Sequence, residues 1–200
     1  MRTRKPAQER RREIVDAALR LVAQVGPERL TTRDIAAAVG ISEAALFRHF
    51  ATKDGLWAAV IGRLEERSVA RWARILAEPA PPLDQLRGLL TAQLALVASE
   101  PGVPVILFSG ELHRRSPALR AALLALMLRF QHTLETVVGE AQRAGTLRAD
   151  RPAAVIALAT IALLQGLVLR WSLTGHASAL LEEAGPAVEL LLHGLRIDRC

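Results

Sequence analysis

The sequence predicts an all-α protein, and three observations support that fold class. Hydrophobic residues make up 51% of the 200 residues, which suffices for a sizeable buried core. Alanine and leucine predominate, β-branched residues occur in short patches, and tyrosine is absent, a composition that favours helix over sheet. Apolar residues also recur at helical spacing. We expect about nine helices, with a three-helix N-terminal domain over residues 1–53 and a helical bundle over residues 54–200.

The first helix is predicted over residues 7–25. Gly26 and Pro27 follow it, a pair in which the glycine favours a helix end and the proline cannot continue the helix. Arg10 opens a run of three arginines, which is either a solvated helix start or an arm that tracks a DNA duplex. The apolar face of this helix carries Ile14, Ala18, Leu21, Val22 and Val25.

Two short helices are predicted next, joined by a tight turn. Thr31 can cap the first, because its hydroxyl can accept a backbone N–H bond while Asp34, three residues later, can reach back to the cap. Gly40 stops this helix, and Ser42 can cap a second one that ends at about His49.

A long helix is expected from Lys53 to about Ala77, and proline and glycine divide the chain beyond it. In the longest later segment, apolar residues recur at steps of three and four between Ser116-Pro117 and Gly145, so one stripe is expected to face the core. That stripe is Leu119, Leu123, Leu126, Phe130, Leu134, Val137 and Ala141. The breaks fall at residues 78–82, 99–102, 115–117, 144–146 and 174–176.

Residues 153–169 are nearly all apolar and are flanked by Arg151 and Arg170. Their number lies at the short edge of the roughly 17 to 25 residues that a membrane span needs, and they include Gln165. A membrane span is therefore the alternative, and a helix buried on every side, in a domain core plus a subunit interface, is the simpler interpretation. Gly185-Pro186 is expected to open a last helix that completes this interface.

The net charge of +6 is concentrated near the N-terminus. Residues 1–53 hold 11 Lys or Arg against 6 Asp or Glu, and the remaining residues hold 15 against 14. This distribution is typical of a nucleic-acid-binding head on a neutral scaffold, with a solvated basic arm as the alternative. Cys200 is the single cysteine, which excludes an intramolecular disulfide and suits a reducing cytoplasm. Glu13 and Asp16 interrupt the segment after the basic start, which argues against a signal peptide.

The stretch "VGISEAALFRHFATKDGL" carries the most informative pattern. Counted from Thr32 as position one, Ala36 falls at five, Gly40 at nine and Leu46 at fifteen. Two short helices that cross steeply need a small residue where they touch, a glycine at the turn and apolar residues in a shared core. This is helix-turn-helix spacing, and it predicts that residues 43–49 enter a DNA major groove.

The continuation "LFRHFATKDGL" resembles the signature of the TetR/AcrR family of bacterial one-component regulators, which reads roughly Leu-Tyr-x-His-Phe-x-x-Lys-x-x-Leu. The resemblance covers about residues 10–60 and extends upstream through "LTTRDIAAAVGIS". Beyond residue 60 it is one of length and helical architecture. The matching residues are Leu46, His49, Phe50, Lys53 and Leu56.

The resemblance implies contacts with the phosphates of double-stranded DNA. Thr32 and Arg33 would meet one phosphate, and His49 and Lys53 resemble phosphate ligands of the family. Phe47 departs from the pattern, because the family usually has a tyrosine there that donates its hydroxyl to a phosphate. That missing hydrogen bond is worth about 1 kcal/mol.

The resemblance also implies which residues approach the bases. Ser42 would cap the recognition helix, and either Ser42 or Glu43 would approach DNA. Ala44 and Ala45 offer only methyl groups, which predicts apolar contact with thymine methyls plus shape readout, with Arg48 adding a donor.

A family member of this kind is a ligand-responsive regulator, commonly a repressor, that binds a pseudo-palindromic operator as a homodimer. Residues 151–174 and 186–197 are the expected four-helix dimer seam. An apolar or aromatic small-molecule inducer would bind among helices four to eight and shift helix four, and the alternative role of each lining residue is plain core packing. The candidate lining residues are Trp72, Leu107, Phe108, His113, Phe130, Gln165 and Trp171.

Two other functions remain open. One is an inducer-independent DNA-binding architectural or cell-division factor on the same fold, and the other is a membrane-associated protein that uses residues 153–169. The sequence has no metal-ligand spacing, no Gly-rich phosphate loop and no nucleophile elbow. We therefore expect no enzyme activity, no cofactor and no metal, and a cytoplasmic protein without a membrane partner.

Overall fold

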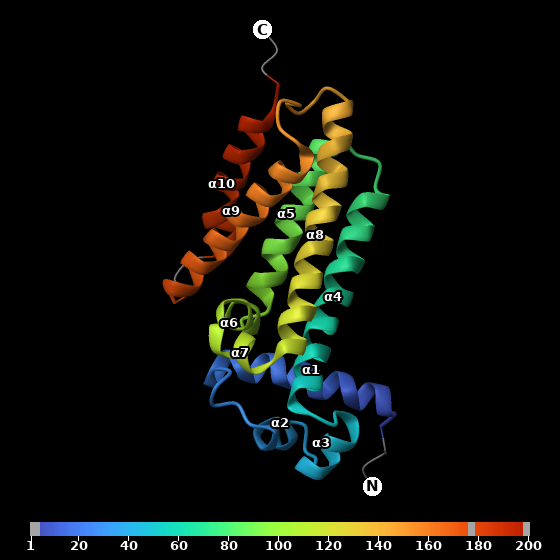
Figure 1. The fold of residues 1–200 in the computed structure, drawn as a ribbon, viewed down its shortest axis with the longest axis vertical. Helices are drawn as coiled ribbons and strands as arrows, with labels where there is room; N and C mark the ends of the chain where they lie inside the picture. Colours follow the sequence, from blue (N-terminus) through green and yellow to red (C-terminus); the bar gives the residue numbers. More distant parts are fainter. Residues whose placement is uncertain (1–4, 176–178, 198–200) are drawn as a thin grey trace. The chain divides into compact units, whose positions relative to one another are not determined.

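The structure, a computed structural model, describes residues 5–175 and 179–197, and within them it contains ten α-helices and no strand (Figure 1). The all-α prediction is confirmed. One more helix is present than the nine expected, because residues 102–115 form two short helices and Ser109 caps the second. The helices are α1 Ala7–Val25, α2 Thr32–Ala38, α3 Glu43–His49, α4 Lys53–Ala77, α5 Pro82–Ser99, α6 Gly102–Phe108, α7 Gly110–Arg115, α8 Pro117–Arg143, α9 Ala153–Leu173 and α10 Leu180–Leu195.

The chain divides into two compact units. Unit 1 comprises residues 1–67 and 100–126, and unit 2 comprises residues 68–99 and 127–200. Helices α4 and α8 each begin in unit 1 and end in unit 2. The boundary expected at residue 53 separates a DNA-binding domain from a ligand-binding and dimerisation domain. That functional division stays a prediction. The expectations for Cys200 and for the first four residues lie outside the part of the chain that the structure describes.

The core of unit 1 forms where α1, α2, α3 and α6 pack around the first turns of α4. Trp57, which is 2% exposed, is among the largest fully buried side chains there. Helix α6 approaches α1 so closely that a Cβ atom on Gly102 would lie 2.2 Å from the backbone oxygen of Leu19. Only glycine fits at that contact, because real Cβ atoms do not come so near to backbone.

Helix α8 confirms the predicted apolar stripe. Leu119, Phe130 and Leu134 are buried, and the other members of the stripe are buried or half-buried. Ser116 caps the helix, since its Oγ accepts the N–H of Leu119 at 3.2 Å, and Gly145 adopts a positive φ of 66° just beyond the other end.

Within one chain, helix α9 is buried on one side only, and the predicted burial of its other side in a subunit interface stays a prediction. One face holds Ile156, Thr160 and Leu164 in the core of unit 2, whereas Leu158 and Leu173 on the remaining surface are 57% and 78% exposed. The sequence did not separate these faces, because both are apolar and the pattern therefore has no amphipathic contrast.

Helix α9 is also long and apolar enough to cross a bilayer, with one third of the tested window buried. Helices α5 and α6 reach the length and hydropathy of a membrane span only when they are counted together, and the chain bends by 101° between them. A core helix of a globular protein has the same length and composition, so this result does not assign a membrane span.

Helix α10 begins at Leu180, earlier than the expected start at Gly185-Pro186. Pro186 lies inside the helix. Leu180 and Ala184, which precede the proline, are buried in unit 2, and this packing offsets the backbone hydrogen bond that a proline removes.

Candidate nucleic-acid interface

Helix α2 begins with the predicted capping box. The backbone N–H of Thr31 donates to Asp34 Oδ2 at 2.9 Å, and the backbone N–H of Asp34 donates to Thr31 Oγ1 at 3.2 Å. The hydrogen bond from the Thr31 hydroxyl is the main reason that the pKa of Asp34 is lowered, so this carboxylate stays ionised at the positive end of the helix.

The turn between α2 and α3 has the geometry that the spacing predicted. Gly40 has a φ of +66°, a left-handed conformation that glycine adopts without steric cost. Ile41 donates its N–H to the carbonyl of Ala36 at 3.0 Å, and Ala36 itself is 2% exposed. Leu46 of α3 is 1% exposed, so it closes the core that the two short helices share.

Helix α3 presents one face to solvent. Ser42 caps it by accepting the N–H of Ala45 at 3.2 Å. Ala44, Phe47 and Arg48 are exposed, and Phe47 is 42% exposed although it is a large apolar residue. A capped short helix with an outward apolar and basic face has the form of a recognition helix.

Glu43 connects the recognition helix to the first turn of α2. The hydroxyl of Thr32 donates to the Glu43 carboxylate, and Arg33 Nε lies 4.0 Å from Glu43 Oε2. Two predicted phosphate contacts thus share one acidic partner in the structure, and a phosphate would compete with Glu43 for both of them. The contacts with DNA stay predictions.

Two arginines of α1 hold this motif in place, a role that the sequence did not reveal. Arg10 Nη1 donates to the carbonyl of Val39 at 3.2 Å, and Arg11 Nη1 donates to the carbonyl of His49. The Arg11 guanidinium also lies 4.2 Å from the ring centroid of Phe50. These contacts join residues about 30 to 40 positions apart, so no local pattern could have shown them.

His49 is the last residue of the recognition helix and Lys53 is the first residue of α4, and both are half-buried. Burial is the main cause that lowers the pKa of His49, and the charges of Arg11, Arg10 and Arg48 lower it further, so the imidazole is neutral at neutral pH. Lys53 Nζ donates to the carbonyl of Leu30 at 2.5 Å. The pKa of Lys53 is lowered mainly by burial and secondarily by Arg115.

The candidate inducer residues are divided between the two units. In unit 2, the rings of Trp72 and Phe130 stack with centroids 4.8 Å apart, and Gln165 Nε2 lies 3.8 Å from Met127 Sδ. Trp171 is also in unit 2 and is 6% exposed.

Leu107, Phe108 and His113 belong to unit 1. His113 Nε2 lies 2.9 Å from the carbonyl of Ile106, Leu107 is half-buried and Phe108 is 37% exposed. Ligand contact by any of the seven residues stays a prediction. Within residues 5–175 and 179–197, no group of three or more His, Cys, Asp or Glu could hold a metal ion.

Two family models match the chain. The model described as bacterial regulatory proteins, tetR family, matches residues 14–60, and the model described as tetracyclin repressor-like, C-terminal domain, matches residues 82–184. The first match covers the motif formed by α2 and α3, and the two matches together span most of the chain.

Individual relatives are similar over most of the chain. The nucleoid occlusion factor SlmA of Vibrio atlanticus is 37% identical over 134 residues, which are 66% of this chain and 67% of that relative. The fatty acid degradation regulator FadR from Bacillus halodurans has a TM-score of 0.84 at 19% identity, with 98% of this chain and 99% of that chain covered. FadR from Bacillus subtilis, solved in complex with stearoyl-CoA, has a TM-score of 0.81 at 16% identity, with 92% and 99% covered. At these identities, the two structural likenesses establish the fold alone.

Proposed function

Because this chain belongs to the TetR family of bacterial regulatory proteins, we propose that it is a ligand-responsive transcriptional repressor. It binds a pseudo-palindromic operator as a homodimer in the cytoplasm, and an apolar small-molecule inducer releases it. The observation that carries this proposal is the capped recognition helix α3, whose Ala44, Phe47 and Arg48 are exposed while Leu46 anchors it in the core.

Exposed apolar residues on α9 support the dimer. Val155, Leu158, Leu169 and Leu173 are between 40% and 78% exposed. Successive members are 3, 11 and 4 residues apart, which at 3.6 residues per turn places them along one side of the helix. A continuous apolar stripe in water is unfavourable and is typical of a protein interface. Leu190 of α10, which is 74% exposed, is a further large apolar residue at the surface of unit 2. Two copies of this surface on a two-fold axis would form the four-helix seam.

The inducer would bind in unit 2, beside the stacked rings of Trp72 and Phe130. Helix α4 begins in unit 1 at Lys53 and carries Trp72 in unit 2, so a ligand that moves this helix would also move the DNA-reading head. The stearoyl-CoA complex of the structurally similar FadR is in keeping with an apolar ligand for this fold.

A second candidate function is an inducer-independent DNA-binding factor that acts on the chromosome. The similarity to nucleoid occlusion factors, at 37% identity over two thirds of the chain, favours it. The two functions differ in one measurable respect. A repressor releases its operator when an apolar ligand is added, whereas the second kind of protein keeps the same affinity for DNA across a ligand panel.

The proposed DNA contacts predict that the double variant His49→Ala, Lys53→Ala binds operator DNA at least about 100-fold more weakly, because a dimer loses four phosphate contacts of about 1 kcal/mol each. The plot of log affinity against log salt should also become shallower by about 2, since two lysines no longer displace counterions. Fluorescence anisotropy with the intergenic duplex beside the protein's own gene measures both quantities.

Arg20→Ala is the control for that experiment, because Arg20 is an exposed cation of α1 outside the proposed interface. It should keep the affinity within about two-fold. Equal and weak binding by the wild type and the double variant, to any duplex, would contradict the proposed operator recognition.

Phe47→Tyr should strengthen operator binding by about five-fold per head, because the added hydroxyl can donate one hydrogen bond of about 1 kcal/mol to a phosphate. Phe47 is 42% exposed, so the hydroxyl is accommodated without repacking the core. Phe108→Tyr, on an exposed residue of α6, is the matched control and should leave the affinity unchanged. An unchanged or weaker affinity of Phe47→Tyr would place Phe47 away from the DNA backbone.

A further inference from the structure

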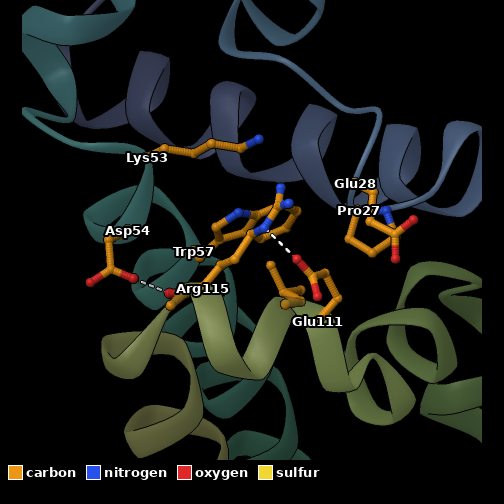
Figure 2. Close-up of a pocket in the computed structure, with 9 residues that line it drawn as sticks. Pro27, Glu28, Lys53, Asp54, Trp57, Glu111 and Arg115 are labelled. Carbon is orange, nitrogen blue, oxygen red and sulfur yellow. Dashed lines mark hydrogen bonds and ion pairs between the residues drawn. The ribbon is translucent and has the colours of Figure 1, made fainter.

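Unit 1 contains a cavity of about 180 Å³ beside the start of α4 (Figure 2). Pro27 and Glu28, from the loop after α1, line one side of it. Lys53 and Trp57 of α4 line another side, and α7 contributes Arg115. Every lining residue belongs to unit 1, so this cavity is separate from the inducer position proposed in unit 2.

Two cationic side chains converge on the cavity. Figure 2 shows the Lys53 ammonium and the Arg115 guanidinium directed into the same space above the ring of Trp57. They are close enough that the charge of Arg115 contributes to the lowered pKa of Lys53. An anion between two like charges relieves their repulsion.

Three carboxylates also line the cavity, and one of them, Glu111, is paired with Arg115 itself. Glu111 accepts a hydrogen bond from Arg114, and its Oε1 lies 2.5 Å from Arg115 Nε, which orients the Arg115 guanidinium. Among the described residues, Glu111 is the one ion-pair partner of Arg115. Asp54 accepts the hydroxyl hydrogen bond of Ser116. Glu28 is exposed, so water screens its charge.

The remaining walls are apolar. Trp57 is 2% exposed and Leu112 is 5% exposed, so both are fixed by the core of unit 1, and Pro27 adds a rigid ring. A cavity of this size is smaller than the roughly 300 Å³ at which drug-sized pockets begin, so it suits a ligand of about ten heavy atoms.

We propose that this cavity binds a small organic carboxylate with a compact apolar body, whose carboxylate pairs with Lys53 and Arg115 while its apolar body packs against Trp57, Leu112 and Pro27. Arg115 supplies the parallel N–H donors that a carboxylate recognises, and Lys53 supplies a second charge. The site is distinct from the apolar inducer position, because the two sites take ligands of different chemistry and lie in different units.

A carboxylate bound in this cavity would also lower the affinity of the protein for DNA. This consequence rests on the proposed role of Lys53 as a phosphate contact. A carboxylate that binds the Lys53 ammonium competes directly with a DNA phosphate for the same group. By linkage, DNA would weaken carboxylate binding by the same factor.

Benzoate is a suitable probe, and the indole N–H signals of the three tryptophans in a ¹⁵N–¹H correlation spectrum provide the readout. Trp57 lines the cavity, whereas Trp72 and Trp171 belong to unit 2 and report on the proposed inducer position. Benzoate should shift the Trp57 signal alone, with a dissociation constant on the order of millimolar, as expected for a ligand of this size. Neutral benzamide, which has the same shape, should leave the signal in place.

Arg115→Gln should weaken benzoate binding by about ten-fold or more, because it removes charge-assisted hydrogen bonds. Arg114→Gln is the matched control, since Arg114 also pairs with Glu111 and is similarly exposed but does not line the cavity. It should bind benzoate as the wild type does. A Trp57 signal that does not move, or that moves equally in Arg115→Gln, would overturn the proposed site, as would shifts confined to Trp72 and Trp171.

The competition for Lys53 is measured separately, by operator binding at saturating benzoate. A loss of affinity in the wild type that disappears in Arg115→Gln would support it, and an unchanged affinity in both would overturn it. Because the Trp57 signal is recorded without DNA, failure of the proposed DNA binding cannot be mistaken for failure of the carboxylate site.

Discussion

Gly102→Ala is expected to destabilise the folded protein by about 3 kcal/mol or more, the upper part of the range for overpacked cores. The new Cβ would lie 2.2 Å from the backbone oxygen of Leu19 and 2.9 Å from Val22 Cγ1. A backbone oxygen inside a helix cannot rotate away as a flexible side chain can. The junction of α6 with α1 would therefore have to open, and urea denaturation followed by circular dichroism measures the loss of stability.

Gly62→Ala is the matched control for this variant. Gly62 lies within α4, and a Cβ built there meets no atom within 4 Å. Alanine should stabilise this position by about 0.5 to 1 kcal/mol, because glycine loses more conformational freedom in a helix. If Gly102→Ala had the same midpoint urea concentration of unfolding as the wild type, α6 would not pack against α1 as described.

The double variant Leu158→Glu, Leu190→Glu should dissociate the proposed dimer and reduce operator affinity by at least about 100-fold. Leu158 is 57% exposed and Leu190 is 74% exposed, so the folded monomer tolerates the charges. At a two-fold interface the change buries four unpaired carboxylates, each of which costs several kcal/mol. Light scattering after size exclusion gives the mass, and anisotropy gives the affinity, because a monomer engages only one half-site.

Leu124→Glu is the control for the dimer experiment. Leu124 is 54% exposed on α8, and it lies on neither α9 nor α10. This variant should retain the mass and the operator affinity of the wild type. If the double variant kept the dimer mass at micromolar concentration, the seam would lie elsewhere on the surface.

Local sequence rules predicted most of the helices and the frame of the DNA-reading motif. The observed bounds of α1, Ala7–Val25, equal the predicted range, and α4 ends at Ala77 as expected. The caps at Thr31 and Ser42 are present as predicted. These features depend on residues three to five positions apart, whose chemistry is readable from the chain itself.

The same rules failed where tertiary packing decides the outcome. The apolar stretch of α9 gave no indication of which face is buried, because both faces carry alanine, valine and leucine. The start of α10 was misplaced because proline is a strong local signal for a helix start, and the burial of Leu180 and Ala184 overrides it.

The sequence by itself determined the fold class, the helix-turn-helix spacing and the membership of a regulator family, since each rests on residue types at fixed short separations. Only the tertiary structure decided which polar and charged groups from distant parts of the chain meet. Arg11 reaches the carbonyl of His49, and Arg115 comes beside Lys53 over Trp57, although these residues are far apart in the chain. Such pairings depend on how the helices cross in three dimensions. The energy of that packing is shared among many side chains that are distant in the sequence, so no local sequence pattern reports it.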